Sequence, residues 1–201
     1  LVNQLLALAR TEAQATHGSS ESLPKQRLDL SELAREVTLE WIDEALNQGH
    51  DLGLEADSPA WVTGNAVLLK EMLKNLIDNA LTYTPSPGTI TVRVAKAARV
   101  EAASPEALNA APSEFVMLQV EDSGVGIATH ERESVLQPFY RVLGTGKDGS
   151  GLGLAIVQHI VQQHQANMSL LDNPHIAQNA TQNKTPNKGL LVDIRFVAAK
   201  L

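Results

Sequence analysis

Apolar residues recur along this chain either every three or four positions or at every second position, and these two spacings predict its helices and strands. Segments 29–50, 65–82 and 151–165 place apolar side chains every three or four positions, as amphipathic helices do. Ser31 is the expected N-cap of the first helix. Short apolar or alternating runs predict strands at 51–56, 60–64, 88–97, 115–122, 168–172 and 189–197. Helices that alternate with mostly antiparallel strands indicate an α+β fold, a two-layer α/β sandwich.

The remaining segments divide the chain into one domain and a short N-terminal appendage. Residues 1–17 carry an apolar helical stripe with nothing of their own to pack on, and the polar residues 18–26 are typical of a linker. We therefore expect one domain over residues 27–201. Within it, residues 98–113 and the low-complexity stretch that follows the strand at 168–172 are predicted to be long loops.

The helix predicted at 65–82 carries a polar stripe beside its apolar one. Glu71, Asn75, Asp78, Asn79 and Thr82 recur at steps of three and four. A solvated helix face is the common explanation, but glutamate, lysine or glutamine would fill such a face with better helix propensity than asparagine. The alternative is the wall of a polar cleft. Asparagine side-chain oxygens suit magnesium, which also retains phosphate oxygens and water in its coordination shell.

Two glycine-bearing segments offer further ligand contacts. In "EDSGVGI", Asp122 ends a predicted strand, and Gly124 and Gly126 allow a planar ligand to approach the backbone closely. In "GTGKDGSGLGL" (144–154), five glycines lead directly into a helix, so that consecutive N–H groups would form an anion site. A flexible linker is the ordinary explanation for such glycines. Because few apolar side chains hold residues 142–150, we expect them to form a lid over the ligand.

Composition and charge narrow the function classes. The chain of 201 residues has a net charge of −7, which argues against nucleic acid as the main partner. It contains no cysteine, so disulfides, thiol nucleophiles and cysteine-ligated zinc are excluded. No apolar run approaches the roughly 20 residues of a membrane span. We therefore expect a membrane contact only through segments that are missing from this sequence.

Four segments, in this order, resemble the sequence boxes of one family. "EMLKNLIDNALTYTP" resembles the N box, "VEDSGVGI" the G1 box, "QPFYRV" the F box and "GSGLGLAIV" the G2 box of the catalytic, ATP-binding domain of bacterial sensor histidine kinases, in the GHKL ATPase superfamily. The resemblance covers about residues 27 to 201 and implies the Bergerat (GHKL) fold. Residues 1–17 are similar to the end of the second helix of that family's dimerisation and histidine-phosphotransfer hairpin.

The resemblance implies a role for each matching residue. Asn75 would be a magnesium ligand, Glu71 would position the metal's water shell, and Arg141 would approach the γ-phosphate. Asp122 would accept a hydrogen bond from the adenine amino group, and Tyr83 would pack on the base or sugar. The other residues expected to bind the nucleotide are Asn79, Thr82, Gly124, Gly126, Ile127, Gly149, Gly151, Leu152 and Gly153.

Some residues depart from the family pattern. Thr82 stands where the family often has lysine, which removes one charge directed at the phosphates, and the usual His-Gly-Gly turn reads His-Gln-Ala at 164–166. Neither change affects the metal or adenine positions. His50, in "GHDLGLEADSP", partly mimics the family's acceptor motif but lacks the basic residue and Thr-Pro that follow it. We interpret His50 as a surface loop residue and expect the phosphorylated histidine upstream of Leu1.

Residues and resemblance together predict the ATP-binding catalytic domain of a protein-histidine kinase. It would transfer the γ-phosphoryl group of Mg-ATP to a histidine on its own dimerisation and phosphotransfer domain, in a full-length homodimer, for relay to a response-regulator aspartate. We expect it to be the cytoplasmic domain of an inner-membrane sensor. The alternatives are another GHKL ATPase, such as an anti-sigma-factor serine kinase, and a non-catalytic docking module with the same fold.

Overall fold

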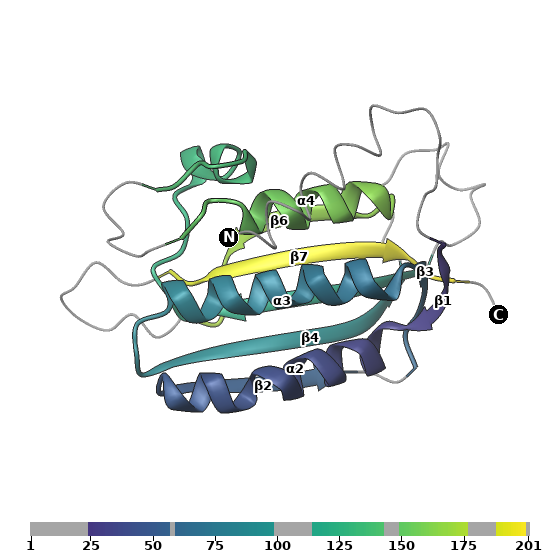
Figure 1. Cartoon of the computed structure of the whole chain (residues 1–201), viewed down its shortest axis with the longest axis horizontal. Helices are drawn as coiled ribbons and strands as arrows, with labels where there is room; N and C mark the ends of the chain where they lie inside the picture. The colour runs from purple at the N-terminus through teal and green to yellow at the C-terminus, as the bar shows by residue number, and fades with distance from the viewer. Residues whose placement is uncertain (1–23, 57–58, 99–113, 143–148, 177–187, 200–201) are drawn as a thin grey trace.

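The structure is a computed structural model that describes residues 24–56, 59–98, 114–142, 149–176 and 188–199. Several predicted segments therefore lie wholly or mostly outside the described residues, namely the N-terminal helical appendage, the linker, the loop at 98–113, most of the lid and most of the low-complexity loop that follows residues 168–172. In the described part, a five-stranded sheet is covered on one face by three helices that lie side by side (Figure 1). This arrangement is the two-layer α+β sandwich that the sequence predicts.

The elements follow the predicted order closely. The helices are α2 (Leu30–Asn47), α3 (Ala66–Tyr83) and α4 (Gly153–Gln163), with two short 3₁₀ turns, η2 (Thr129–Glu131) and η3 (Ser134–Leu136). The strands are β1 (Gln26–Asp29), β2 (His50–Ala56), β3 (Trp61–Gly64), β4 (Gly88–Ala98), β5 (Glu114–Asp122), β6 (Asn167–Asp172) and β7 (Leu190–Val197).

The large sheet is mixed but mostly antiparallel, as expected. Its strand order is β2-β4-β5-β7-β6, and only the β2–β4 pair is parallel. Strands β1 and β3 form a separate antiparallel ribbon. The central strand β5 packs against α3, whereas α4 packs against α3 and the edge strand β6. The candidate site lies at the end of β5, beside α3 and the start of α4.

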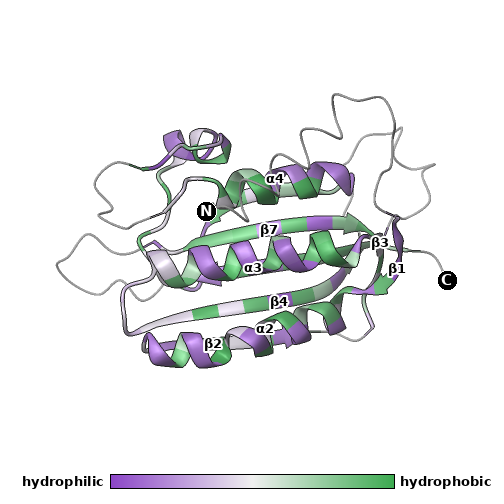
Figure 2. Cartoon of the chain, viewed as in Figure 1, coloured by the Kyte–Doolittle hydropathy of each residue, from purple (hydrophilic) through white to green (hydrophobic). Residues whose placement is uncertain are grey.

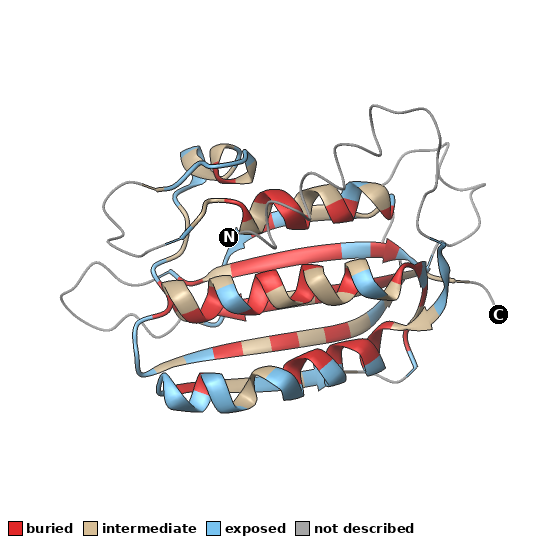
Figure 3. Cartoon of the chain, in the orientation of Figure 1, coloured by how far each residue is buried: buried red, intermediate tan, exposed pale blue. Residues whose placement is uncertain are grey.

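The hydrophobic core lies between the helices and the sheet. The helices are striped with hydrophobic and hydrophilic positions, whereas β7 is mostly hydrophobic (Figure 2). Helix α2 is buried along its first half and largely exposed along its second (Figure 3). The largest fully buried side chains are Leu30, Leu69, Met72, Leu73, Ile77, Ile90, Leu118, Leu152, Ile160 and Ile194. Burial of these apolar stripes holds the helices on the sheet.

Two local predictions were wrong. The N-cap of α2 is Asp29 and not Ser31, because the Asp29 carboxylate accepts hydrogen bonds from the Ser31 amide (3.0 Å) and from the Ala60 amide (2.9 Å). His50 is not a surface loop residue. It begins β2 in parallel register with β4, and its side chain is only 5% exposed. Gly49, at φ +77°, forms the turn after α2, and β2 begins at the next residue, His50.

Candidate functional site

A cavity of about 510 Å³ lies between α3, the turns that follow β5 and the start of α4. Volumes of this size suit a small-molecule ligand. Its apolar wall is formed by Leu76, Val120, Val125, Ile127, Val135, Val142, Leu154, Leu190 and Val192. Its polar wall includes Asp78, Asn79, Thr82, Tyr83, Asp122, Tyr140, Arg141 and Ser150.

Most of the predicted ligand contacts line this one cavity, although they come from segments far apart in the sequence. They are Asn79, Thr82, Tyr83, Asp122, Gly126, Ile127, Arg141, Gly149, Gly151 and Gly153. Gly124 and Leu152 lie behind the wall. A Cβ on Gly124 would come within 2.6 Å of the Tyr83 carbonyl oxygen, and Leu152 is fully buried in the core. These two residues shape the site from beneath.

Glu71 and Asn75 lie further back along α3 and do not line the cavity. Asn75 is buried, and its amide nitrogen donates to the Glu71 carbonyl (2.8 Å) and to the Glu71 carboxylate (3.3 Å). Because both hydrogen bonds use the nitrogen, the amide oxygen is the atom suited to a hard cation. The metal role of Asn75 and the supporting role of Glu71 stay predictions.

Asp122 is the buried acid of the site. One oxygen, Oδ1, accepts hydrogen bonds from the Gly124 amide (2.8 Å) and the Leu190 amide (3.2 Å). Burial raises the pKa of Asp122 to about 6, and these two hydrogen bonds oppose the rise because they favour the charged form. A buried carboxylate that is ionised near neutral pH is a strong acceptor for an amino group of a ligand.

The start of α4 forms the opposite, anion-binding end of the cavity. The amide nitrogen Nδ2 of Asn79 is buried and has no hydrogen-bond partner among the described residues. It faces Gly153, where a Cβ would lie 2.9 Å from that nitrogen. A helix N-terminus presents free N–H groups to anions. An unsatisfied buried donor beside it marks a place where a ligand oxygen fits.

The turn at 137–142 is fastened to the glycine segment. Gly151 adopts φ +70°, and a Cβ there would lie 2.8 Å from the Tyr140 carbonyl oxygen. Its own carbonyl accepts a hydrogen bond from the Phe139 amide (2.9 Å). The Tyr140 hydroxyl donates to Glu131 (3.4 Å). These contacts place Arg141 at the exposed rim of the cavity.

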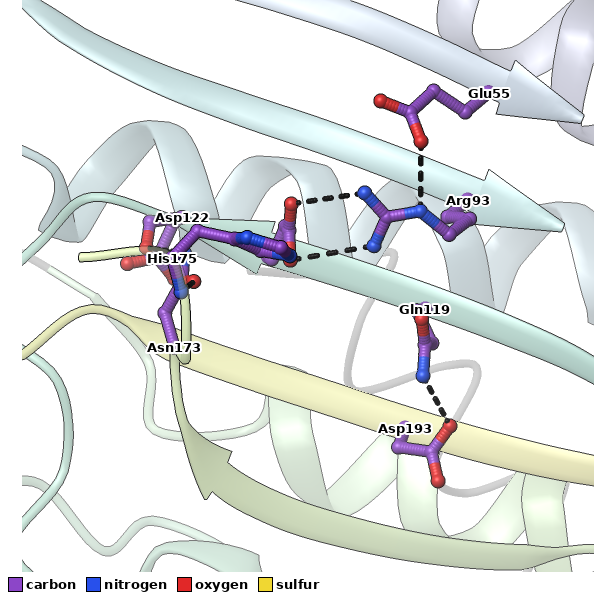
Figure 4. Close-up of polar contacts among 8 residues, drawn as sticks. Glu55, Arg93, Gln119, Asp122, Asn173, His175 and Asp193 are labelled. Atoms are coloured by element: carbon purple, nitrogen blue, oxygen red, sulfur yellow. Dashed lines mark hydrogen bonds and ion pairs between the residues drawn. The ribbon is translucent and has the colours of Figure 1, made fainter. Parts of the chain in front are cut away.

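Sequence reasoning missed several parts of the site. Asp78, although it belongs to the polar stripe of α3, was not proposed as a contact, yet it lines the cavity. Partial burial raises the pKa of Asp78, and the Glu44 carboxylate adds to the rise. Asn173, after β6, was also missed. It donates to the Asp122 carbonyl (2.9 Å), and the two residues lie together at the end of the sheet (Figure 4).

Comparison with known proteins finds relatives over most of the chain. A family described as histidine kinase-, DNA gyrase B-, and HSP90-like ATPase matches residues 64–198. The chain is 32% identical over 171 residues to the sensor protein kinase PmrB of Pseudomonas aeruginosa, covering 85% of this chain and 31% of that protein. It is 31% identical over 179 residues to the sensor protein IrlS of Burkholderia pseudomallei, covering 88% of this chain and 34% of that protein. The chain thus spans about a third of the length of these relatives.

Solved structures share the fold. The mycobacterial sensor histidine kinase MprB superposes with a TM-score of 0.65 at 24% identity, covering 88% of this chain and 99% of that chain. Full-length ShkA in complex with AMPPNP superposes with a TM-score of 0.69 at 20% identity, covering 100% of this chain and 35% of that chain. At these identities the likeness establishes the architecture alone.

Proposed function

Because the chain belongs to the family of histidine kinase-, DNA gyrase B- and HSP90-like ATPases, we propose that it binds Mg-ATP and acts as the catalytic domain of a sensor histidine kinase. In this proposal the γ-phosphoryl group passes to a histidine on a dimerisation and phosphotransfer domain of the same protein, and then to a response-regulator aspartate. The names of the relatives support the sensor-kinase branch.

One observation carries the proposal. The buried carboxylate of Asp122 and the buried side-chain nitrogen of Asn79, which has no hydrogen-bond partner among the described residues, line the same cavity. A helix begins at the other end of that cavity. Adenine carries an amino donor that matches the first, and a polyphosphate carries oxygens that match the amide and the helix N-terminus. The apolar wall between them suits a flat base. The site therefore fits a nucleotide triphosphate by its chemistry as well as by its size.

Magnesium would be held largely through the phosphates and water, with one protein ligand. Among the described residues, no group of three or more His, Asp or Glu side chains is placed to hold a metal ion. The Asn75 oxygen is the protein atom we assign to the metal, and Glu71 keeps the amide oriented through its two hydrogen bonds. When bound, the ion would neutralise phosphate charge during transfer.

The residues of this chain position the nucleotide rather than supply a nucleophile. Arg141, at the rim, is placed to neutralise charge at the outer end of the polyphosphate. Asn79 and the first turn of α4 would hold the inner phosphates. The attacking histidine must come from outside the described domain. His50, which partly mimics an acceptor motif, is buried at the start of β2 and cannot meet a γ-phosphate in line.

Transfer of labelled γ-phosphate tests the proposal. Residues 27–201 alone should bind ATP and acquire no label on histidine, whereas a supplied dimerisation domain of the same kinase should acquire acid-labile label. The variant Asn79→Ala should lower that transfer, and His50→Gln should leave it unchanged. Acid-stable label on serine would indicate a serine kinase instead. Tight ATP binding with no label on any component would favour a non-catalytic docking module.

The protein's place in the cell follows from the same proposal. We infer that the domain works on the cytoplasmic side of a membrane sensor, as the sensor names of the relatives suggest. In the part of the chain that the structure describes, no helix has the length and apolar character to cross a bilayer.

A further inference from the structure

Asn173 is a buried polar residue immediately after β6, and it connects three segments. Its side-chain nitrogen donates to the Asp122 carbonyl (2.9 Å), and its side-chain oxygen accepts from the His175 amide (2.9 Å). Its backbone amide donates to the Lys188 carbonyl (3.1 Å). The residue is only 4% exposed. Asn173 thus ties the end of β5 to both sides of the β6–β7 connection (Figure 4).

Gly189 fits into this junction with no space to spare. It adopts φ +60°, and a Cβ there would lie 2.2 Å from the Asp122 carbonyl oxygen and 2.8 Å from the Asn173 Cβ. Its amide donates to the Gly124 carbonyl (2.9 Å). The next residue, Leu190, directs its amide at the Asp122 carboxylate (3.2 Å). The position of that amide therefore depends on how closely Asn173 holds the Asp122 carbonyl and the Gly189 turn.

We propose that Asn173 is the positioning residue for the carboxylate of Asp122. By holding the junction, it aligns the Gly124 and Leu190 amides on one carboxylate oxygen and leaves the other oxygen to an exocyclic amino group of the base. This inference rests on the proposed nucleotide binding. Asn173 acts through Asp122, since it is absent from the wall of the nucleotide cavity and lines a smaller cavity with Glu121 and His175.

If Asn173 only stabilised the turn, fewer of its hydrogen bonds would be needed. An asparagine that only stabilised the turn would need its side-chain oxygen, which accepts from the His175 amide. The amide nitrogen would then be free to face water. Here it is directed instead at the backbone of the residue whose carboxylate lies in the nucleotide cavity. The contact to Asp122 is the part of the arrangement that a turn alone does not require.

Several charged side chains surround Asp122 and Asn173, and a test of Asn173 must leave them unchanged. On the cavity side, Asp78 and Arg141 line the same wall as Asp122. On the other face of β5, Glu121 pairs with Arg93 (3.3 Å) and approaches His175 (3.9 Å), while Glu55 also pairs with Arg93 (2.8 Å). Figure 4 shows Arg93 bridging these carboxylates. A neutral substitution at Asn173 leaves all of these charges in place.

Two variants and a matched control separate positioning from folding. Asn173→Ser retains an acceptor for the His175 amide but is too short to reach the Asp122 carbonyl. Asn173→Asp retains the shape, replaces the donor with an acceptor and adds a negative charge close to Glu121 and Asp122, so the neutral Asn173→Ser variant carries the main comparison. Asn167→Ser changes an exposed asparagine at the other end of β6 and serves as the control. Calorimetry would compare ATP with inosine triphosphate, which carries a carbonyl in place of the 6-amino group.

We expect Asn173→Ser to weaken ATP about tenfold and inosine triphosphate little, as when one well-aligned hydrogen bond is lost. Asn173→Asp should weaken ATP further, and Asn167→Ser should bind as the unmodified protein does. The pH midpoint of ATP binding should also rise in Asn173→Ser, because misaligned amides favour the charged carboxylate less.

Other outcomes overturn the inference. A variant at Asn173 with a lower melting temperature but an unchanged ratio of the two affinities would show a structural role. Failure of both variants to fold would lead to the same conclusion. If the unmodified protein does not bind ATP, the proposed function is refuted, and that result is distinct from a failure of the Asn173 variants alone.

Discussion

The substitution Asp122→Asn should stabilise the nucleotide-free domain while it weakens ATP binding. The residue Asp122 is 6% exposed, and burial raises the pKa of its carboxyl to about 6 from 3.8. The folded state therefore binds this proton more tightly than the unfolded state. Its stabilising effect is complete below pH 3.8, decreases as the pH rises through the interval to 6, and is absent above it.

The size of the effect follows from the pKa difference. A shift of about two pH units corresponds to about 3 kcal/mol of unfolding free energy at pH 7, at 1.36 kcal/mol per unit. This is a large share of the roughly 5–15 kcal/mol that keeps a typical domain folded. Asparagine never ionises, and its oxygen can still accept from the Gly124 and Leu190 amides. Asp122→Asn should thus gain up to about 3 kcal/mol at pH 7 and almost nothing at pH 4.

ATP binding should change in the opposite direction. The carboxylate accepts a charge-assisted hydrogen bond from the base amino group, whereas asparagine presents at best a neutral acceptor. A loss of about 1.5–3 kcal/mol, or roughly tenfold to more than a hundredfold in affinity, is expected for ATP. Inosine triphosphate, which lacks that amino group, should be affected much less. Asp122→Asn would therefore raise the free energy of unfolding and lower the affinity for ATP.

Asp193→Asn provides the matched control. Asp193 is also a buried aspartate of the sheet, but it accepts hydrogen bonds from Gln119 (2.9 Å) and Arg195 (2.8 Å) and does not line the nucleotide cavity. This variant should be less stable by about 1 kcal/mol and bind ATP normally. Denaturant unfolding at pH 4 and pH 7, with calorimetry, measures both effects. An Asp122→Asn domain that is less stable at pH 7, or that loses ATP and inosine triphosphate equally, would refute the reasoning.

Two further predictions concern other buried polar groups. Asn75→Ala should reduce the magnesium-dependent part of ATP binding and cost about 1 kcal/mol of stability; unchanged magnesium dependence in calorimetry would remove the metal role. Burial lowers the pKa of His164 from 6.5, and its ring accepts from the Asn65 amide (3.0 Å) while Nδ1 donates to the Ile160 carbonyl (2.7 Å). Stability should therefore fall as the pH drops below 6.5, and thermal melts of His164→Gln should show a weaker pH dependence.

The fold was predictable from sequence because its main signals are local. Apolar periodicity located every long helix and every strand of the large sheet to within a few residues, since each element must bury one face. The errors arose where a distant segment decides the outcome. Asp29 caps α2 while it also binds the Ala60 amide, and no sequence pattern connects residues 29 and 60. His50 was misplaced for a similar reason, because pairing with β4 extends β2 back to it.

The site was predictable where it depends on residue type and not where it depends on packing. A helical projection places Asn75 on the polar stripe, but α2 packs beside α3, where Lys74 pairs with Glu40 (2.6 Å), and Asn75 is buried. The role of Asn173 could not be predicted from the sequence, because the residue begins a low-complexity polar stretch that contains several other asparagines. Its role depends on a hydrogen bond across 51 positions of sequence.

Two energetically costly polar groups line the same cavity, and their position there is an argument for ligand binding. Asp122 is a buried acid, and the side-chain nitrogen of Asn79 is buried with no hydrogen-bond partner in the described part of the chain. Beside them, Gly126 and Gly151 adopt positive φ angles that glycine accepts and other residues rarely do. The buried acid and the unsatisfied side-chain amide each cost stability in the nucleotide-free domain. A ligand that donates a hydrogen bond to the first and accepts one from the second would offset part of that cost, and at a hundred times its dissociation constant it would add about 2.7 kcal/mol. Natural sequences retain such conflicts mainly where function requires them.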